Sequence, residues 1–538
     1  MDIPLQLSPD FCGPPTRVDT TQRPLVTLKT LLSDRALTVK RPRQQPPSLI
    51  FSLPAEMIAE IFLQATAEDQ DADAIRIPMH FHFVLSQVCG LWRAVAIHTP
   101  SLWSRVVLHL GARTSGFGGI TTLARTCFER SCELPLALII TSSVTNADTI
   151  PNLSMDLVLP VRHRIRHLEL RLPVVLTESI FKLPKNSLKA LRSISVYAIV
   201  SADPASWFRS MSGLEGAPHL DRVKLACVHA PGSLIQWRTI DLRFDPYVAR
   251  LPWAQLTDLH LQDLELRCDD AIYALEMATS LVRCALEVRM FEPLAPVIAF
   301  TVPPGQDAPA PPAPPKPKPP VTLPALLALD LAISGWPSAP ADFFDRMILP
   351  SLKDLSIKYK DRQPLPCATL TALQTRSSFS LERFLLASRT GDTLLPFLQA
   401  NPLLSRVQLV FCALELTPLA EGLTRVARTP GLGILPCLRA LALTDRWTEE
   451  APHATWARAT KAVVEMARSR WRVHGDAAGA RLVGFTFGSQ MGLSAKKAER
   501  MERFRAEGMR LRIVPILAER AHLRRADYLG MNLWADED

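Results

Sequence analysis

The amino-acid sequence predicts an α/β solenoid that follows a small helical module, and three observations indicate this fold class. A short apolar pattern recurs eleven times between residues 165 and 487. Two short segments with helical hydrophobic periodicity precede these repeats. Hydrophobic residues make up 48% of the 538 residues, so the chain can bury a large core or a long repeat array.

The first 46 residues differ from the rest of the chain. Residues 1–46 are polar and interrupted by proline, and we expect a disordered or loose tail. The basic run Lys40–Arg43 could be part of a nuclear import signal, but four such residues are more often a solvated stretch of tail.

Residues 47–105 predict a module of three short helices. Pro54 suits the first position of a helix, and Glu56 then lies in the first turn, where the helix dipole favours a negative charge. The apolar residues that follow have the spacing of one helix face: Met57, Ile58, Ile61, Phe62 and Ala65.

A second helix is expected after the acidic loop 68–73. Its predicted apolar stripe consists of Leu85, Val88, Cys89, Trp92 and Val95. Thr99 and Pro100 then resemble a cap and a first helical residue, starting a third, short turn. This turn presents Leu102 and Trp103, and we expect Trp103 to be a core residue.

From residue 106 onward the chain takes the repeated pattern apolar-x-x-apolar-x-apolar. The pattern runs from Ile165-Leu168-Leu170 to Leu482-Phe485-Phe487, and successive middle positions are 23 to 45 residues apart. Its apolar-x-apolar step is typical of a short strand with one buried face, and each unit has room for one strand and one helix. This is the signature of a leucine-rich-repeat solenoid, and the uneven spacing predicts an irregular horseshoe.

The longest spacing contains a proline-rich segment. Between Cys284 and Leu329, which are 45 residues apart, ten of the 18 residues in Pro303–Pro320 are proline. Proline lacks an N–H donor and favours extended backbone, so this segment cannot join the core. Removing it leaves a repeat of 27 residues. We therefore expect 303–320 to be a loop inserted between two parts of one solenoid, 106–302 and 321–530; a P-x-x-P ligand is the less favoured alternative.

The last repeat is expected to be closed by a helix and a strand. Ser494–Glu507 predicts a basic helix, for which Gly508 suits the C-terminal cap. Met509, Leu511 and Ile513 then alternate with arginines, as in a half-buried final strand.

The sequence contains no recognisable catalytic or metal-binding motif. There is no P-loop and no G-x-S-x-G elbow, and none of the ten cysteines forms a C-x-x-C pair. The pairs His80/His82 and His163/His167 are more easily explained as core or surface histidines than as metal ligands. We therefore expect a protein that is not an enzyme and that has no catalytic residue, metal or cofactor.

Charge and hydropathy limit the partners and the compartment. A net charge of +9 is weak support for nucleic acid at this length, and the basic residues of the last predicted helix interleave with glutamates. No apolar run approaches the roughly 20 residues that span a bilayer, and the N-terminus has no secretory signal pattern. Scattered cysteines fit reduced thiols. We expect a cytoplasmic or nuclear protein that binds no membrane and for which nucleic acid is an unlikely partner.

Three motifs in order carry a resemblance to a known family. They are L-P-x-E at Leu53–Glu56, V-C-x-x-W-R at Val88–Arg93 and T-P-x-L-W at Thr99–Trp103. These roughly fifty residues resemble an F-box, in particular that of the F-box-like proteins with C-terminal leucine-rich repeats that abound in mushroom-forming (basidiomycete) fungi. The rest of the chain matches this family only in its general leucine-rich repeat pattern. The third helix is short, and the Asn or Cys that regular repeats carry after the strand occurs only at Cys412.

The resemblance implies a substrate-recognition subunit of an SCF-type cullin–RING ubiquitin ligase. The F-box would bind the Skp-type adaptor, and the repeats would hold an unknown protein substrate. The residues implied to bind the adaptor are Leu53, Pro54, Met57, Ile58, Ile61, Val88, Cys89 and Trp92.

Physical reasoning supports this division of labour and leaves alternatives open. A module of about fifty residues buries too little surface to be stable alone, and tryptophan is enriched at interface hot spots. The apolar stripe could instead pack on the first repeat as a cap. The alternative function is a leucine-rich-repeat interaction scaffold that does not engage a ligase, and a nucleic-acid-binding repeat protein is a third reading with little support.

Overall fold

The computed structural model describes the chain from residue 49 to residue 515, with gaps. The described residues are 49–67, 81–111, 117–142, 157–200, 211–229, 244–247, 249–290, 319–335, 339–359, 365–388, 394–411, 413–424, 434–445, 453–472, 480–489 and 493–515. The predicted tail, the acidic loop 68–73, Cys412 and most of the proline-rich segment lie outside them. The chain divides into two compact units, Met1–Ile58 and Ala59–Asp538, which are described separately. The domain boundary predicted at residue 105 stays a prediction.

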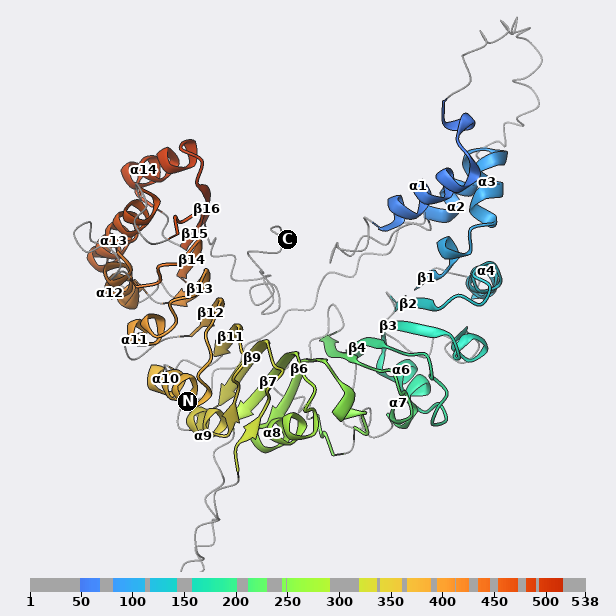
Figure 1. Cartoon of the computed structure of the whole chain (residues 1–538), viewed down its shortest axis with the longest axis horizontal. Helices are drawn as coiled ribbons and strands as arrows, with labels where there is room; N and C mark the ends of the chain where they lie inside the picture. Colours follow the sequence, from blue (N-terminus) through green and yellow to red (C-terminus); the bar gives the residue numbers. More distant parts are fainter. Residues whose placement is uncertain are drawn as a thin grey trace, which may run out of the picture. The chain divides into compact units, whose positions relative to one another are not determined.

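Among its described residues, the second unit is built on a 14-stranded parallel sheet whose strands lie side by side in chain order (Figure 1). The strands are β1 Arg105–Leu110, β2 Leu136–Ser142, β3 Ile165–Pro173, β4 Ser193–Val200, β5 Arg222–His229, β6 Asp258–Arg267, β7 Arg283–Met290, β9 Ala328–Gly335, β11 Asp354–Tyr359, β12 Arg383–Ala387, β13 Arg406–Phe411, β14 Ala440–Asp445, β15 Gly484–Ser489 and β16 Arg510–Pro515. Two short strands, β8 Val321–Thr322 and β10 Met347–Ile348, pair with each other.

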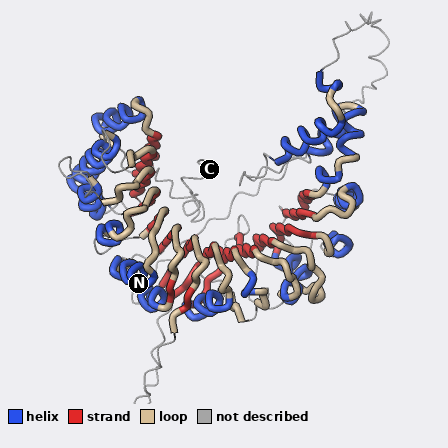
Figure 2. Tube along the Cα trace, viewed as in Figure 1, coloured by secondary structure: helices blue, strands red, loops and turns tan. Residues whose placement is uncertain are grey.

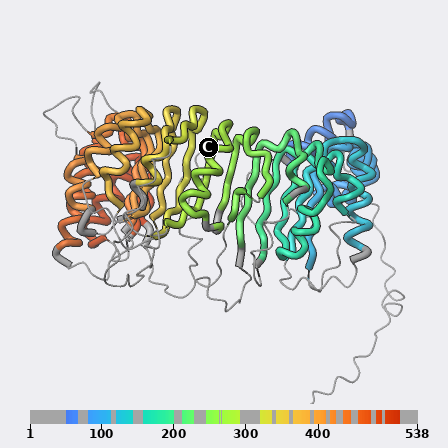
Figure 3. The backbone as a smooth tube through the Cα atoms, turned by 90° about the horizontal axis from the view of Figure 1, so that it is seen from below, coloured from blue at the N-terminus to red at the C-terminus, as the bar shows by residue number. Residues whose placement is uncertain are grey.

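Helices and single helical turns connect most of the strands and lie along one side of the sheet (Figures 1 and 2). The helices are α4 Phe117–Arg130, α6 Val174–Phe181, α7 Ser212–Glu215, α8 Cys268–Met277, α9 Ala339–Asp345, α10 Cys367–Ser377, α11 Leu395–Gln399, α12 Ala413–Leu423, α13 His453–Trp471 and α14 Ala495–Ala506. A view at right angles shows the repeats of this unit side by side (Figure 3). This α/β architecture is compatible with the predicted solenoid-like fold.

The apolar repeats occupy successive strands of the sheet in one register. Their middle positions stand opposite one another from β3 to β15, and each is at most 2% exposed: Leu168, Ile194, Val223, Leu259, Cys284, Leu329, Leu355, Phe384, Val407, Leu441 and Phe485. The strand predicted at each repeat is therefore confirmed. Because side chains alternate between the two faces of a strand, both apolar residues of the apolar-x-apolar step point to the helix-covered face.

Two strands at the start of the sheet were missed by the repeat pattern, which begins at residue 165. Val106 on β1 stands opposite Leu138 on β2, and Leu138 stands opposite Leu168 on β3. Val106 and Leu138 are both 0% exposed, so the buried ladder begins two strands before the first repeat that the pattern identified.

The sheet continues across the proline-rich segment. Strands β7 and β9, which flank it in sequence, pair directly. In addition, the Val282 carbonyl accepts hydrogen bonds from the N–H groups of Leu327, at 2.8 Å, and Ala328, at 3.1 Å. The same forked bond recurs at other strand starts, for example from Glu382 and Arg383 to the Lys353 carbonyl. Backbone hydrogen bonds thus tie each repeat to the one before it.

Buried polar side chains also join neighbouring repeats. Arg470 on α13 is 1% exposed and donates to the carbonyls of Leu423, at 2.7 Å, Leu435, at 3.1 Å, and Ile434. Leu423 is the last residue of α12, whose free carbonyls favour a cation. The charge of Arg470 is therefore buried against the end of a helix dipole.

The predicted closing elements are confirmed. Helix α14 is followed by Gly508 at φ +97° and then by β16. Its exposed ion pairs, Arg503–Glu499 at 2.8 Å and Arg505–Glu502 at 3.0 Å, have the spacing expected of a solvated helix face.

One further glycine is required by the backbone. Gly335 ends β9 at φ +116°, and a Cβ atom added there would lie 1.9 Å from the Met290 carbonyl oxygen.

No helix within the described ranges is both long and apolar enough to cross a membrane.

Candidate functional site

In the first unit, helix α1 (Ala55–Ala67) begins where proline predicted it. The Pro54 carbonyl accepts the N–H groups of Met57, at 3.1 Å, and Ile58, at 3.2 Å, which closes the first turn. Leu53 is 36% exposed, Met57 is 53% exposed and Pro54 is also exposed.

Ile58 differs from the other predicted adaptor-binding residues of this unit. Its side chain is 0% exposed, although Met57 beside it is more than half exposed. Successive residues of an α-helix point about 100° apart, so the two side chains leave the helix on different faces. Ile58 therefore belongs to the core, and it has no exposed surface to offer a partner in this conformation.

In the second unit, the remainder of α1 packs against the second predicted segment through two aromatic rings. Phe62 is 1% exposed, and its ring centroid lies 5.0 Å from that of Trp92 in an edge-to-face arrangement. Ile61, the neighbour of Phe62, is 44% exposed. Trp92 is half-buried, and its buried Nε1 has no hydrogen-bond acceptor among the described residues.

The second predicted helix is two helices, which corrects the sequence prediction. Helix α2 (Phe81–Val88) ends before Cys89, and α3 (Gly90–Ile97) begins after it. Cys89 has extended backbone angles (φ −158°, ψ 172°), and its half-buried Sγ caps α3 by accepting the Trp92 N–H at 3.5 Å. The break changes the direction of the chain, so a single periodic stripe through Cys89 does not exist.

Each of the two helices buries a different part of the predicted stripe. Leu85 and Val95 are 5% and 7% exposed, but Val88 is 57% exposed. Two further exposed residues, Val84 at 44% and Leu91 at 40%, were missed by the sequence reasoning. Val84 lies four residues before Val88 on α2, and this helical spacing is the signal that could have identified it; Leu91 lies on α3, beyond the break, where no such spacing applies.

The third predicted turn lies in the core. It is the single turn η3 (Pro100–Trp103), in which Trp103 is 0% exposed and donates its Nε1–H to the Ala96 carbonyl at 2.7 Å. The ring centroid of Trp103 lies 4.6 Å from that of His82 and 4.3 Å from the guanidinium carbon of Arg130. The core role predicted for Trp103 is confirmed, and His82 is a core histidine; His80 lies outside the described residues.

Exposed aliphatic side chains are concentrated in this part of the chain. Of the twelve large hydrophobic residues that are exposed within the described ranges, six lie between Leu53 and Leu91: Leu53, Met57, Ile61, Val84, Val88 and Leu91. Exposed apolar side chains of this kind are candidates for contact with a binding partner. Leu53 and Met57 belong to the first unit, and the other four, which belong to the second unit, are its first candidate functional surface.

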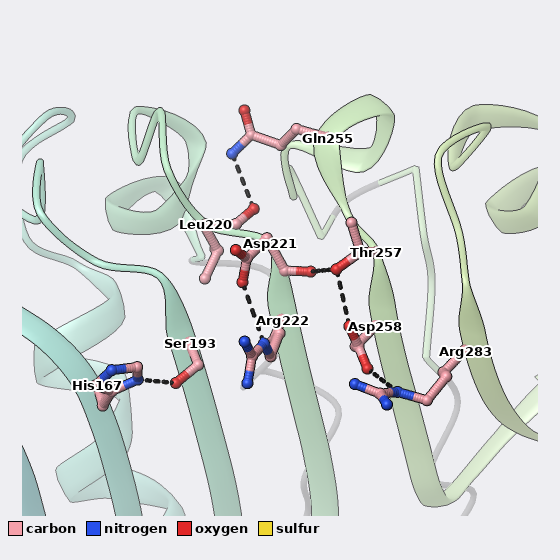
Figure 4. A network of polar contacts seen from close by, with 9 residues as sticks. All are labelled: His167, Ser193, Leu220, Asp221, Arg222, Gln255, Thr257, Asp258 and Arg283. Atoms are coloured by element: carbon pink, nitrogen blue, oxygen red, sulfur yellow. Dashed lines mark hydrogen bonds and ion pairs between the residues drawn. The ribbon is translucent and has the colours of Figure 1, made fainter. Parts of the chain in front are cut away.

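The face of the sheet opposite the helices is a second candidate surface, and polar contacts line the start of its strands (Figure 4). His167 Nδ1 lies 2.7 Å from Ser193 Oγ, Arg222 Nε lies 3.5 Å from Asp221 Oδ1, and Asp258 pairs with Arg283 on the next strand. Burial, and then the neighbouring charges of Arg166 and Arg222, lower the pKa of His167.

The histidines and cysteines form no metal site in the part of the chain that the structure describes. No group of three potential ligands occurs there, and the well-exposed His163 lies 3.9 Å from one carboxylate, that of Glu133. The buried thiols Cys127 and Cys284 have a raised pKa because burial disfavours the thiolate.

Comparison with known proteins assigns no family. No family model matches the chain, and no curated protein matches it significantly. Any assignment of function therefore depends on the motifs and on the two surfaces described above.

Proposed function

We propose that the chain is the substrate-recognition subunit of an SCF-type cullin–RING ubiquitin ligase. Its F-box binds a Skp-type adaptor, and its leucine-rich-repeat horseshoe binds a protein substrate. The repeats need no catalytic group for this role, because holding a substrate beside the ubiquitin-carrying enzyme raises its effective concentration there.

The observation that carries this proposal is that aliphatic residues of the F-box-like motifs are exposed in each of the two units, taken separately. The L-P-x-E motif begins with an exposed Leu53, and the V-C-x-x-W-R motif begins with an exposed Val88. Leaving these side chains in water gains nothing for the isolated chain, whereas covering each with a partner removes apolar surface from water.

Burial refines the set of adaptor-binding residues. In the first unit the candidates are Leu53, Pro54 and Met57, and Ile58 leaves the set because it is buried. In the second unit the candidates are Ile61 and Val88, joined by Val84 and Leu91. Cys89 and Trp92 are half-buried, and they act on the surface by shaping the start of α3.

Co-purification with a purified Skp-type adaptor tests the proposal. The double variant Leu53→Ala/Pro54→Ala and the single variant Met57→Ser should lose adaptor while remaining folded, since all three side chains are exposed. Met277→Ser is the matched control, because Met277 is a methionine on α8 with 43% exposure, and it should retain adaptor.

Wild-type protein that retains no adaptor would contradict the proposal and would favour an interaction scaffold outside any ligase. Adaptor binding that survives in both variants would place the interface elsewhere. The thermal unfolding midpoint of each variant, measured alongside, separates a lost contact from a lost fold.

A further inference from the structure

The open face of the sheet is divided by charge along its length. Two rows of residues run across it in register, one row that includes Arg222 and one that includes Lys224. The first row is Arg105, Ala137, His167, Ser193, Arg222, Asp258, Arg283, Ala328, Asp354, Arg383, Arg406, Ala440, Gly484 and Arg510. The second is Val107, Ile139, Glu169, Ser195, Lys224, His260, Ala285, Asp330, Ser356, Leu385, Gln408, Ala442, Thr486 and Arg512.

From β6 to β12 the charges on this face of the sheet neutralise one another across neighbouring strands. Asp258 on β6 pairs with Arg283 on β7, and Lys358 on β11 lies 3.1 Å from Asp330 on β9. Arg383 on β12 donates two hydrogen bonds, of 2.7 and 2.6 Å, to Asp354 on β11. A charged ligand would gain little on this stretch, because it would have to displace these pairs.

On β3 to β5 the cations exceed the carboxylates. We call the four open-face residues Arg171, Tyr197, Arg222 and Lys224 the basic patch. Arg166 and Arg192 precede the open-face residues His167 and Ser193, and both lie close enough to His167 to affect its pKa. These five cations stand beside two carboxylates. Glu169 accepts a hydrogen bond from Arg171 at 2.8 Å, and Asp221 lies 3.5 Å from Arg222. Arg192 and Lys224 have no carboxylate partner among the described residues, so this stretch carries a net positive charge.

The electrostatic environment of two histidines agrees with this excess. The charges of Arg166, Arg192 and Arg222 add to burial in lowering the pKa of His167. Burial and then the charge of Lys224 lower the pKa of His260, which follows Lys224 in the second row. Both shifts favour the neutral form of the imidazole, which is the direction that an excess of neighbouring positive charge produces.

Tyr197 helps to decide which kind of anion fits. The Arg171 guanidinium carbon lies 4.6 Å from its ring centroid, and the Lys224 ammonium lies 5.3 Å from it. The cations thus already cover this ring, which is the aromatic group of the patch, and it offers no platform on which a base could stack. Sequence-tolerant binding of single-stranded nucleic acid depends on such stacking.

The size of the patch suits a short peptide. Three neighbouring strands extend about 10 Å across a sheet, which an extended chain crosses in about three residues. We propose that the open face of β3 to β5 binds a carboxylate-rich segment of a partner protein. This inference rests on the proposed function in one respect: it names the acidic segment as the part of the ligase substrate that the repeats hold.

Fluorescence polarisation of a labelled decapeptide of alternating glutamate and serine tests the inference on the full chain. Arg222→Glu combined with Lys224→Glu should weaken binding about tenfold or more at low salt, because two attractive charges become repulsive. Wild-type affinity should itself fall as the salt concentration rises. Should the double reversal disturb folding, Arg222→Gln with Lys224→Gln should give a smaller loss in the same direction.

The sheet supplies a matched control. Arg406 lies in the same row as Arg222, and Arg512 lies in the same row as Lys224, but on β13 and β16. Arg406→Glu with Arg512→Glu changes the net charge by the same amount and should alter affinity by less than about twofold. Equal losses in the two double variants would mean that only total charge matters, which would overturn the inference.

Two further outcomes decide the partner and separate the inference from the proposed function. If an unlabelled oligothymidylate of equal charge displaced the peptide more strongly than unlabelled peptide did, a protein partner would be the wrong assignment. The Arg222/Lys224 variant should still co-purify with the adaptor, and the Met57→Ser variant should still bind the peptide. If the chain bound the peptide but no adaptor, the proposed acidic-peptide surface would stand, and only the proposed role in a ubiquitin ligase would be refuted.

Discussion

The apolar surface of α2 and α3 allows a quantitative prediction. Val88 is 57% exposed and Leu91 is 40% exposed, so a partner that covers them removes about half of each side chain from water. Complete burial of a valine or leucine contributes about 1.5–3 kcal/mol. Half of that for each gives about 2 kcal/mol for the pair, and replacing both with serine should therefore raise the Kd for the adaptor about 30-fold.

Isothermal titration calorimetry with purified adaptor measures this change. The control replaces Val175 and Leu403 with serine, because these residues are a valine and a leucine exposed by 64% and 53% elsewhere in the second unit. The control should bind adaptor like wild type. Both double variants should keep the wild-type unfolding midpoint to within about 2 °C, since exposed substitutions seldom affect stability.

The reasoning would be refuted if the Val88/Leu91 variant and the control bound adaptor with equal affinity. Exposure at these positions would then have no connection with adaptor binding. A lowered unfolding midpoint in the Val88/Leu91 variant alone would show that these side chains support the fold rather than meet a partner.

Three further predictions concern the fold that supports these surfaces. Ile58→Ala should lower the free energy of unfolding by about 2–4 kcal/mol, measured by urea denaturation, because it leaves a cavity at a fully buried position. Gly335→Ala should reduce soluble expression or stability sharply, because the new Cβ meets a carbonyl oxygen. In Gly508→Ala the new Cβ meets no atom within 4 Å, so the positive φ alone should lower the free energy of unfolding by only about 1 kcal/mol. Similar effects in both variants would show that backbone strain alone matters. Peptide mapping after iodoacetamide treatment of the folded protein should find exposed Cys132 alkylated at pH 8 and Cys127 unmodified, because burial raises the pKa of Cys127 to about 11 and only the thiolate reacts; rapid alkylation of Cys127 would show that its site opens readily.

Local patterns in the sequence were sufficient to predict the repeated strands. The apolar-x-apolar step at Leu168, Val223 and Leu441 depends only on the alternation of side chains along a strand. It can therefore be recognised in the sequence without knowing which residues pack against the strand. The helix that ends before Gly508 was predictable for the same reason, since capping is decided within a few residues.

Other features depended on contacts between residues far apart in sequence. Met57 and Ile58 are equally apolar neighbours, and only packing against other residues made one core and the other surface. The break at Cys89 interrupts a stretch whose hydrophobic periodicity continues on both sides, and the local signal for it is Gly90, the first residue of α3.

The pairing of charges on the open sheet face is the clearest example of a feature that the sequence alone does not predict. The residue types at alternate strand positions determine that Arg222, Lys224, Arg283 and Arg383 point away from the helices. Whether each cation is neutralised depends on which residue stands beside it on the next strand. Arg283 meets Asp258, which is 25 residues earlier in the chain, whereas Lys224 meets no carboxylate among the described residues. Register across the sheet decides such neighbours, and register is a property of the folded chain rather than of any short stretch of sequence.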